Sequence, residues 1–198
     1  MHFTIITRCS RPDNLEAVQD SIRNVFGLTE HTYQHILIVD CTGPYKDSDY
    51  KQFADKADKV SYVYDKTGND KFMAADIDNA LIAFNVPDDS YVYILDDDNI
   101  LHPDFLDVCK EIEDRDIIVF KVKGHSNWGR SDIGNAIRHI DWANFITKAE
   151  VMKRIKVFRK DKKSSEIDGN FFNNAVWDAK CSVKFIDREL AYYNALKR

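Results

Sequence analysis

Apolar and β-branched residues recur in short runs along the first 122 residues, and polar residues bound each run. The runs cover residues 3–7, 35–39, 61–64, 91–95 and 117–122. Short runs of this composition are typical of buried strands. Segments with helical periodicity separate the first four runs. This alternation predicts a largely parallel sheet with helices on both faces.

The helical signal is strongest between the first two runs. Ser10-Arg11-Pro12-Asp13 has the form of a capping box, and helically spaced apolar residues follow it: Leu15, Val18, Ile22, Val25 and Phe26. A weaker pattern predicts a second helix over residues 49–57. An apolar stripe predicts a third helix over residues 71–84, which carries Asp76 and Asn79 on another face.

Beyond Gly124 the pattern is less regular. It contains a short apolar run over residues 144–147, a predicted helix over residues 167–179 and a predicted strand over residues 182–186. No change of composition marks a boundary, and 198 residues suffice for one core. We therefore expect a single α/β domain over residues 1–198, with a central, mostly parallel mixed sheet flanked by helices.

The composition narrows the classes of function. A formal net charge of -5 and a pI near 5.7 argue against a dedicated nucleic-acid surface, which needs an excess of Lys and Arg. The four cysteines form no C-x-x-C pair, so neither a zinc site nor a disulfide framework is indicated. No run approaches the roughly 20 apolar residues of a transmembrane helix, and no signal peptide precedes the first strand. We expect a cytoplasmic protein without a transmembrane segment.

Three consecutive carboxylates, Asp96, Asp97 and Asp98, directly follow the fourth predicted strand. In extended backbone, residues two apart project to the same side, so Asp96 and Asp98 can converge while Asp97 faces elsewhere. Open α/β sheets bind ligands at the carboxyl ends of their strands. Mg²⁺ and Mn²⁺ prefer oxygen ligands, a few from protein and the rest from phosphates and water. The cluster predicts a divalent-metal site rather than a simple strand-end turn or helix cap.

Three parts of the sequence resemble GT-A fold glycosyltransferases, particularly the large inverting family of bacterial and viral polysaccharide enzymes. The matching motifs are TIITR followed by RPDNL (residues 4–8 and 11–15), ILIVD (36–40) and YILDDDNILHPDFL (93–106). The likeness covers about the first 110 residues. It implies a Rossmann-like GT-A domain with a nucleotide-binding half over residues 1–110 and an acceptor-binding half over residues 111–198.

The resemblance also implies a nucleotide site. It places Thr7 and Arg8 beside the nucleotide base, Asp40 where it accepts a base N–H, and Asp76 beside the nucleotide. A solvent-facing position on the helix accounts for Asp76 equally well, and a strand-end turn accounts for Asp40.

The same resemblance distributes roles within the aspartate cluster. Asp98 is the expected direct ligand of Mn²⁺ or Mg²⁺, and Asp96 approaches the ribose, a metal-bound water or the metal. Asp97 lies at the same nucleotide-facing strand end, although side-chain alternation favours a structural role for it.

Inverting sugar transfer requires a carboxylate that removes the proton of the acceptor hydroxyl. The family places this base at the start of a late helix, and SSEIDGNFF (residues 164–172) resembles that position. Asp168 is favoured, with Glu166 and Asp141 as alternatives. The implied function is metal-dependent transfer of a sugar from a nucleoside-diphosphate sugar, with UDP favoured, to a glycan or other hydroxyl acceptor.

Two other functions remain open from the sequence. A catalytically silent domain that binds sugar nucleotides would keep Asp96 and Asp98 but would need no base. A nucleotidyltransferase is less favoured, because its first strand would lead into a glycine-rich loop and residues 7–12 contain no glycine.

Overall fold

One mixed sheet organises the protein. The structure is a computed structural model that describes residues 1–27, 29–65, 73–112, 114–124, 140–157 and 166–196. Within these residues the sheet has eight strands in the order β3-β2-β1-β4-β7-β6-β8-β5. Their bounds are β1 (His2–Cys9), β2 (Thr32–Asp40), β3 (Lys59–Val63), β4 (Tyr91–Ile94), β5 (Ile100–Leu101), β6 (Ile117–Lys123), β7 (Phe145–Lys148) and β8 (Val183–Tyr192).

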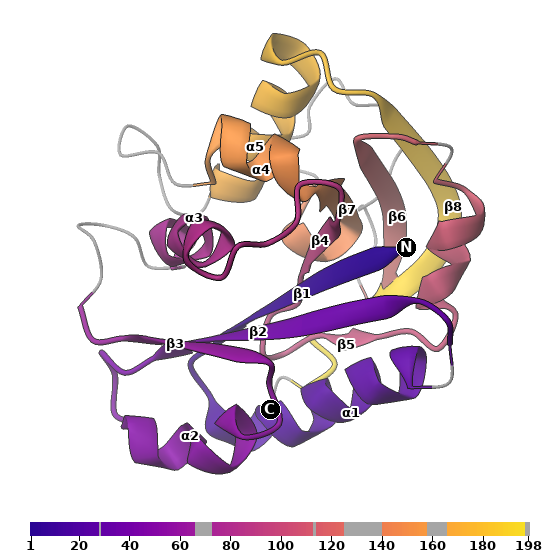
Figure 1. Cartoon of the computed structure of the whole chain (residues 1–198). Helices are drawn as coiled ribbons and strands as arrows, with labels where there is room; N and C mark the ends of the chain where they lie inside the picture. The colour runs from indigo at the N-terminus through magenta and orange to yellow at the C-terminus, as the bar shows by residue number, and fades with distance from the viewer. Residues whose placement is uncertain (28, 66–72, 113, 125–139, 158–165, 197–198) are drawn as a thin grey trace.

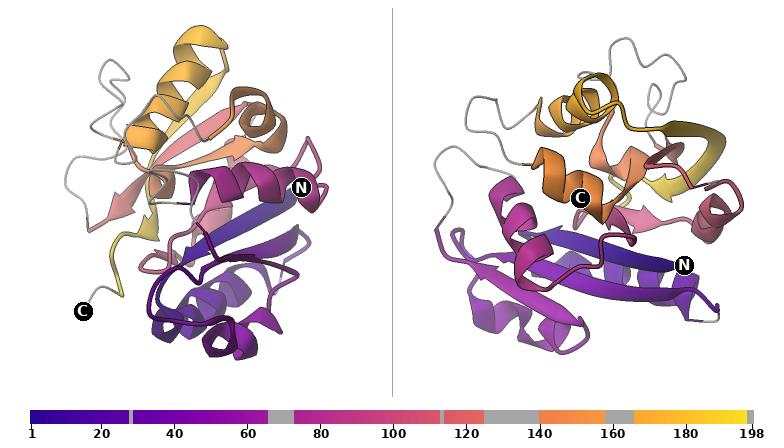
Figure 2. Two further views of the ribbon diagram at one scale, coloured as in Figure 1. Left: turned by 90° about the vertical axis from the view of Figure 1, so that its left-hand side faces the viewer. Right: turned by 45° about the horizontal axis from the view of Figure 1, so that its top comes forward.

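Helices cover both faces of the sheet (Figures 1 and 2). Two helices, α1 and α2, lie on one face, and the other three lie on the opposite face. Their bounds are α1 (Leu15–Phe26), α2 (Asp47–Ala54), α3 (Ala74–Ala83), α4 (Ala149–Ile155) and α5 (Ile167–Asn173). This is the α/β architecture with a mixed, helix-flanked sheet that the sequence predicts.

The first four predicted strands pair in parallel with one another. β1 pairs in parallel with β2 on one side and with β4 on the other, and β3 pairs in parallel with the outer side of β2. Because the carboxyl ends of parallel strands meet at one edge, the residues that follow β1 and β4 are neighbours.

The second half of the chain adds strands of both directions. β7 is antiparallel to β4 and β6, β8 is parallel to β6, and β5 pairs antiparallel with β8. The predicted last strand, residues 182–186, is too short, because β8 continues to Tyr192. Pairing with β5 at Leu101 and Ala191 extends this strand, a long-range contact that periodicity does not reveal.

The predicted apolar stripe of the first helix is confirmed. Its five residues, 15, 18, 22, 25 and 26, are buried in α1. The predicted capping box is wrong, because a 3₁₀ turn (Pro12–Asn14) precedes α1 and no side chain caps either element. Ser10 instead donates to the carboxylate of Asp97. A buried carboxylate gains more from these donors than an exposed helix end does.

The other predicted helices exist with shifted ends. α2 begins and ends earlier than residues 49–57, and α3 covers most of residues 71–84, of which 71 and 72 lie outside the described residues. The helix predicted over residues 167–179 is α5 followed by one π-helical turn (Asn174–Asp178). Apolar spacing locates a helix but does not define its hydrogen-bonding pattern.

An aromatic cluster fills the space between the sheet and α1. Phe105, which is fully buried, lies at its centre in the 3₁₀ helix Phe105–Lys110. Its ring centroid is 5.1 Å from that of Tyr93, 5.9 Å from Phe120 and 6.1 Å from Phe3. Tilted and edge-on rings at these distances pack favourably. The cluster therefore anchors the 3₁₀ helix Phe105–Lys110, which follows the three aspartates in the chain.

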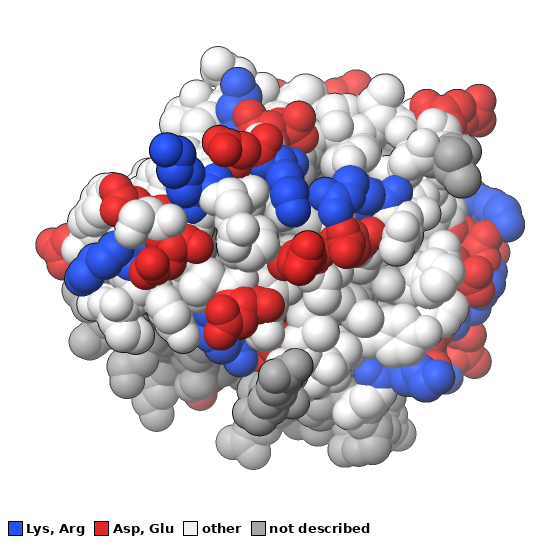
Figure 3. Space-filling view, turned by 90° about the horizontal axis from the view of Figure 1, so that it is seen from below, with Lys and Arg blue, Asp and Glu red and all other residues white. Residues whose placement is uncertain are grey.

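The face covered by α1 and α2 carries charges of both signs. Lys and Arg side chains are interspersed there with Asp and Glu (Figure 3). Such a surface stays hydrated without a large field of one sign. Within the described residues, no helix combines the length and the apolar character needed to cross a bilayer.

We expect Phe105→Ala to destabilise the protein by about 3–5 kcal/mol, because it leaves a cavity among closely packed rings. Urea unfolding followed by circular dichroism measures this change. Trp177→Ala is the control, because Trp177 is 53% exposed and should change stability by less than about 0.5 kcal/mol. Equal effects of the two substitutions would contradict the assignment of Phe105 to the core.

Candidate active site

The site lies where the chain leaves β1 and β4. Beyond the strand ends, the N–H of Leu95 donates to the carbonyl of Ile6 at 2.9 Å, and the N–H of Asp97 donates to the carbonyl of Arg8 at 3.2 Å. These bonds continue the β1–β4 ladder into the aspartate cluster. They place the cluster beside the two arginines that follow Thr7 on β1 and its exit.

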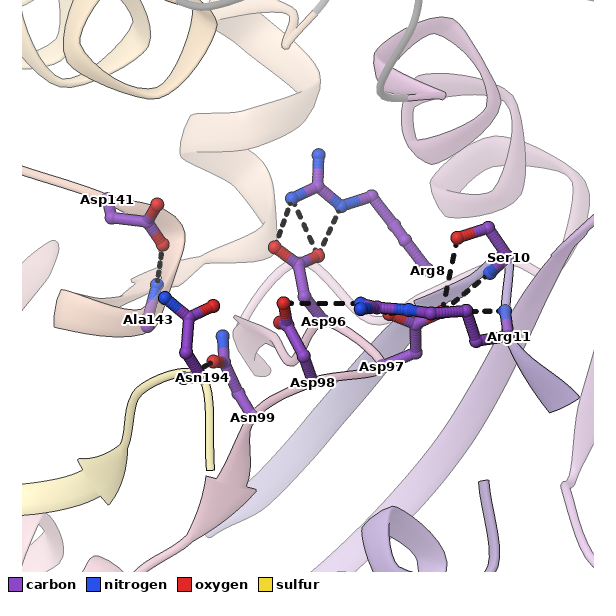
Figure 4. A network of polar contacts seen from close by, with 10 residues as sticks. All are labelled: Arg8, Ser10, Arg11, Asp96, Asp97, Asp98, Asn99, Asp141, Ala143 and Asn194. Carbon is purple, nitrogen blue, oxygen red and sulfur yellow. Dashed lines mark hydrogen bonds and ion pairs between the residues drawn. The ribbon is translucent and has the colours of Figure 1, made fainter. Parts of the chain in front are cut away.

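Arg8 and Asp96 form a bidentate ion pair (Figure 4). The Nε and Nη2 atoms of Arg8 each donate to a different carboxylate oxygen of Asp96 at 2.6 Å. The arginine side chain is only 8% exposed. Burial acts against its charge, yet the carboxylates of Asp96, Asp141 and Asp168 outweigh burial and raise the pKa of Arg8. Arg8 is therefore a fixed positive charge inside the site.

Asp97 turns away from Arg8 toward the loop that follows β1 (Figure 4). Its Oδ2 accepts the backbone N–H groups of Ser10 at 2.7 Å and Arg11 at 2.8 Å, and its Oδ1 accepts from the Arg11 guanidinium. Asp97 is 3% exposed. This buried carboxylate clamps the loop. The strand ends at Ile94, and Asp97 and Asp98 lie in a turn in which the N–H of Asn99 donates to the carbonyl of Asp96 at 3.0 Å, so the extended backbone assumed for these residues is wrong.

Asp98 projects to the same side of the chain as Asp96 (Figure 4). Its Oδ2 lies 3.2 Å from Nη2 of Arg11, whose side chain is 39% exposed. The two carboxylates that alternation predicted to converge therefore differ in environment. Asp96 is held by a buried arginine, whereas Asp98 is joined to a more exposed one.

The second half of the chain contributes Asp141 and Asp168. Asp141 precedes the 3₁₀ turn Trp142–Asn144, and its Oδ1 accepts the N–H of Ala143 at 2.9 Å. Asp168 lies in the first turn of α5, and its Oδ1 accepts the N–H of Gly169 at 3.0 Å. Glu166, the alternative in the same motif, is the N-cap residue of α5 and makes no side-chain cap bond.

Electrostatics connects these two carboxyl groups with the aspartate cluster. Burial, followed by the charges of Asp168 and Asp96, raises the pKa of Asp141 to about 7. Burial, together with the charge of Asp96, raises the pKa of Asp168 to about 6, and Arg8 acts in the opposite direction. The fold thus gathers three carboxyl groups around Arg8. Shifts of this kind, with specific charge partners, are common at functional sites.

The C-terminal segment closes one side of the site, and the sequence did not indicate it. The N–H of Asn194 donates to Oδ1 of Asn99 at 2.8 Å, and the N–H of Leu196 donates to the carbonyl of Asp98 at 3.1 Å. Burial and then the charges of Asp141, Asp98 and Asp96 raise the pKa of Tyr193 to about 12. No periodicity marks such a tail, because its contacts join residues 95 positions apart.

A glycine makes room for this tail. Gly124 has a φ of +101°, which side chains rarely allow, and a Cβ there would lie 3.0 Å from the carbonyl oxygen of Tyr193. Close approach of the two backbones therefore requires glycine at the end of β6.

Three other predicted nucleotide-site residues lie outside this charge cluster. Thr7 is fully buried, and its Oγ1 lies 2.9 Å from Nε2 of His35 on the opposite face of the sheet from Arg8. Asp40 ends β2, where its Oδ1 accepts from the N–H and hydroxyl of Thr42 at 2.9 and 2.6 Å. Asp76 lies in the first turn of α3. The structure brings Arg8 to the aspartates but not Thr7.

The chemistry of the site is that of oxygen donors, which hard divalent cations prefer. Carboxyl groups outnumber guanidinium groups here, with Asp96, Asp97, Asp98, Asp141 and Asp168 against Arg8 and Arg11. Among the described residues, no group of three or more His, Cys, Asp or Glu side chains is arranged to hold a metal. Asp98, with Asp96 beside it, offers oxygen donors of the kind that Mg²⁺ and Mn²⁺ share with phosphate oxygens and water.

The fold is that of the GT-A-type glycosyltransferases, as the sequence motifs suggested. The chain matches no protein-family model and no curated protein. Solved structures are similar to it at low sequence identity, which establishes the fold.

TarS 1–349 of S. aureus aligns with a TM-score of 0.68 and 15% identity over 97% of this chain and 60% of its own. The same fragment in complex with UDP-GlcNAc aligns with a TM-score of 0.63 and 17% identity, over 98% of this chain and 58% of its own. The mannosyltransferase PcManGT of Pyrobaculum calidifontis, in complex with GDP-Man and Mn²⁺, has a TM-score of 0.71 and 13% identity over 99% of this chain and 57% of its own. The chain thus spans about 60% of the TarS fragment.

We expect Asp141→Asn to stabilise the protein at pH 8 by about 1–3 kcal/mol. The raised pKa means that the folded chain takes up a proton more readily than the unfolded chain. Stability linked to that proton is present below about pH 4 and is lost as the pH rises through about 7. Asparagine keeps an oxygen for the N–H of Ala143 but removes the charge.

Urea unfolding at pH 8 and pH 5 in the presence of a chelator measures the effect, which should be smaller at pH 5. Asp89→Asn, at an exposed position, is the control. A variant less stable than the wild type at pH 8 would contradict the unfavourable ionisation of the buried Asp141 carboxyl group.

Proposed function

We propose that this chain is a metal-dependent glycosyltransferase domain. It transfers a sugar from a nucleoside-diphosphate sugar, with UDP as the favoured nucleotide, to a hydroxyl acceptor with inversion. The supporting observation is the gathering of Asp141 and Asp168 with Asp96 around Arg8, at the strand ends of a GT-A-type fold and beside Asp98. In this proposal, carboxylates that bind the nucleotide come from residues 1–110, and the candidate bases close to them come from residues 111–198.

The donor side of the proposal depends on Asp98 and charge balance. A diphosphate would meet a surplus of carboxylates here, so Asp98 would hold a divalent cation between the protein and the phosphates. When bound, the cation supplies positive charge that neutralises the diphosphate. The Mn²⁺ complex of PcManGT with GDP-Man and the UDP-GlcNAc complex of TarS are consistent with this donor class.

The acceptor side of the proposal depends on Asp168. Its carboxylate takes the proton of the acceptor hydroxyl while the hydroxyl oxygen attacks the anomeric carbon. The bond from that carbon to the diphosphate oxygen breaks on the opposite face, and the electron pair leaves with the diphosphate. A raised pKa makes Asp168 a stronger proton acceptor than an ordinary carboxylate, yet leaves it largely ionised above about pH 6.

Asp141 and Asp168 belong to the same buried group of carboxylates, and burial raises the pKa of both. Asp168 is favoured as the base because it lies in the first turn of α5, where the family resemblance places the base. Asp141 remains the alternative.

Asp98→Asn should abolish the Mn²⁺-dependent part of nucleoside-diphosphate binding. The substitution removes the charge that holds the cation but keeps the shape of the side chain. Calorimetric titration with UDP, GDP and CDP, with and without Mn²⁺, measures this. Asp104→Asn is the control, because Asp104 follows the same cluster yet its side chain is 55% exposed and pairs with Arg188. Binding that needs no metal and survives Asp98→Asn would refute the proposal.

Asp168→Asn should lower sugar transfer by roughly 10²–10⁴-fold and leave nucleotide affinity nearly unchanged. For the wild type, the rate should fall as the pH drops through about 6, because a protonated Asp168 cannot accept a proton. Product formation with a panel of hydroxyl acceptors measures both effects.

Glu166→Gln and Asp141→Asn separate the three candidate bases. If Asp168→Asn transferred sugar at the wild-type rate, Asp168 would not be the base. The base would then be Glu166 or Asp141, whichever substitution abolishes sugar transfer. Nucleotide-sugar binding without transfer or accelerated hydrolysis would instead identify a catalytically silent binding domain.

A further inference from the structure

The Arg8–Asp96 pair uses both oxygens of a carboxylate that faces the proposed cation site. Nε and Nη2 of Arg8 each donate to a separate Asp96 oxygen at 2.6 Å, a fork that matches the carboxylate plane. The arginine side chain is 8% exposed, and that of Asp96 is 25% exposed. Few water molecules can replace these bonds if the pair opens.

Asp98 has a looser arginine partner. One contact of 3.2 Å joins its Oδ2 to Nη2 of Arg11, and the Arg11 side chain is 39% exposed. Arg11 also has Asp97 as a closer partner. The partly exposed Arg11 guanidinium can therefore release Asp98 and remain paired with Asp97. The buried Arg8 guanidinium has no comparably exposed position to which it could move.

Other charges hold Arg8 where it is. The charges of Asp141, from the segment before β7, and Asp168, from α5, also favour the charged form of the Arg8 guanidinium. Withdrawal of Arg8 from Asp96 would separate opposite charges in a buried site, which is unfavourable.

We propose that Arg8 keeps Asp96 out of the coordination sphere of the divalent cation, so that Asp98 binds the cation firmly only together with a nucleoside diphosphate. This inference depends on the proposed function and concerns the order in which its ligands bind. A cation that approaches Asp96 must displace a bidentate guanidinium and then lie close to that positive charge. Asp98 is then the ligand that the aspartate cluster supplies, and the cation needs phosphate oxygens to complete a stable set of ligands.

The experiment compares Mn²⁺ binding with and without UDP in the wild type, Arg8→Met and Arg8→Lys. Free Mn²⁺ is measured by electron paramagnetic resonance, a readout that does not require sugar transfer. The wild type should bind Mn²⁺ weakly alone and firmly with UDP. Arg8→Met should raise the affinity for Mn²⁺ alone by roughly tenfold or more, because Asp96 becomes a ligand.

Arg8→Lys distinguishes two effects of Arg8: its occupation of both Asp96 oxygens and its electrostatic repulsion of Mn²⁺. Lysine keeps the charge but cannot bind both carboxylate oxygens as a planar fork. It should also raise the affinity for Mn²⁺ alone, by a smaller factor than Arg8→Met. Addition of Asp96→Asn to either variant should return this affinity to the wild-type level. Arg188→Met is the control and should leave Mn²⁺ binding unchanged, because Arg188 pairs with Asp107 and not with the aspartate cluster.

The outcomes distinguish this inference from the proposed function. Unchanged Mn²⁺ affinity in Arg8→Lys, with intact UDP-dependent binding that Asp98→Asn abolishes, would overturn the role of Arg8 and leave the function standing. Absence of any UDP-dependent Mn²⁺ binding in the wild type would overturn the proposed function itself. Thermal unfolding of each variant verifies folding, and Arg8→Lys keeps the test decisive if Arg8→Met does not fold.

Discussion

Charge compensation between the ends of β1 and β4 is the constraint on which the site depends. Asp96 is partly buried and Asp97 is buried just beyond the end of β4, where an unpaired carboxylate would be unfavourable. Arg8 compensates the first, and Arg11 compensates the second while also contacting Asp98. The continued ladder between the two strands fixes which arginine meets which aspartate, so backbone pairing determines the electrostatics of the site.

The two halves of the sheet contribute different chemistry to one edge. The parallel half supplies oxygen donors at a strand end, and the half with antiparallel strands brings Asp141 and Asp168 close enough to interact with them electrostatically. The turn after β8 then packs against Asn99 and Asp98. Negative charge concentrated in this way lowers the stability of the folded chain above neutral pH, a cost that functional sites commonly carry.

Where sequence reasoning failed, a long-range partner competed with a local one. Ser10 has the sequence context of a helix cap, yet a buried carboxylate 87 positions away binds its N–H and hydroxyl. Alternation along β1 turns Thr7 to the face where His35 is buried, away from Arg8, and its role in a nucleotide site stays a prediction. For both residues the local pattern located the segment, whereas a residue distant in the sequence determined which partner the side chain contacts.

The sequence by itself determined β1 to β4, β6 and the apolar face of α1. These features arise from periodicity along the chain, which each segment carries alone. Only the tertiary structure decided that Arg8 pairs with Asp96 and that Asp141 and Asp168 interact electrostatically with Arg8. It also decided that the C-terminal turn covers one side of the site. Those relations depend on burial and on distances between segments remote in sequence, and neither quantity exists until the layers pack.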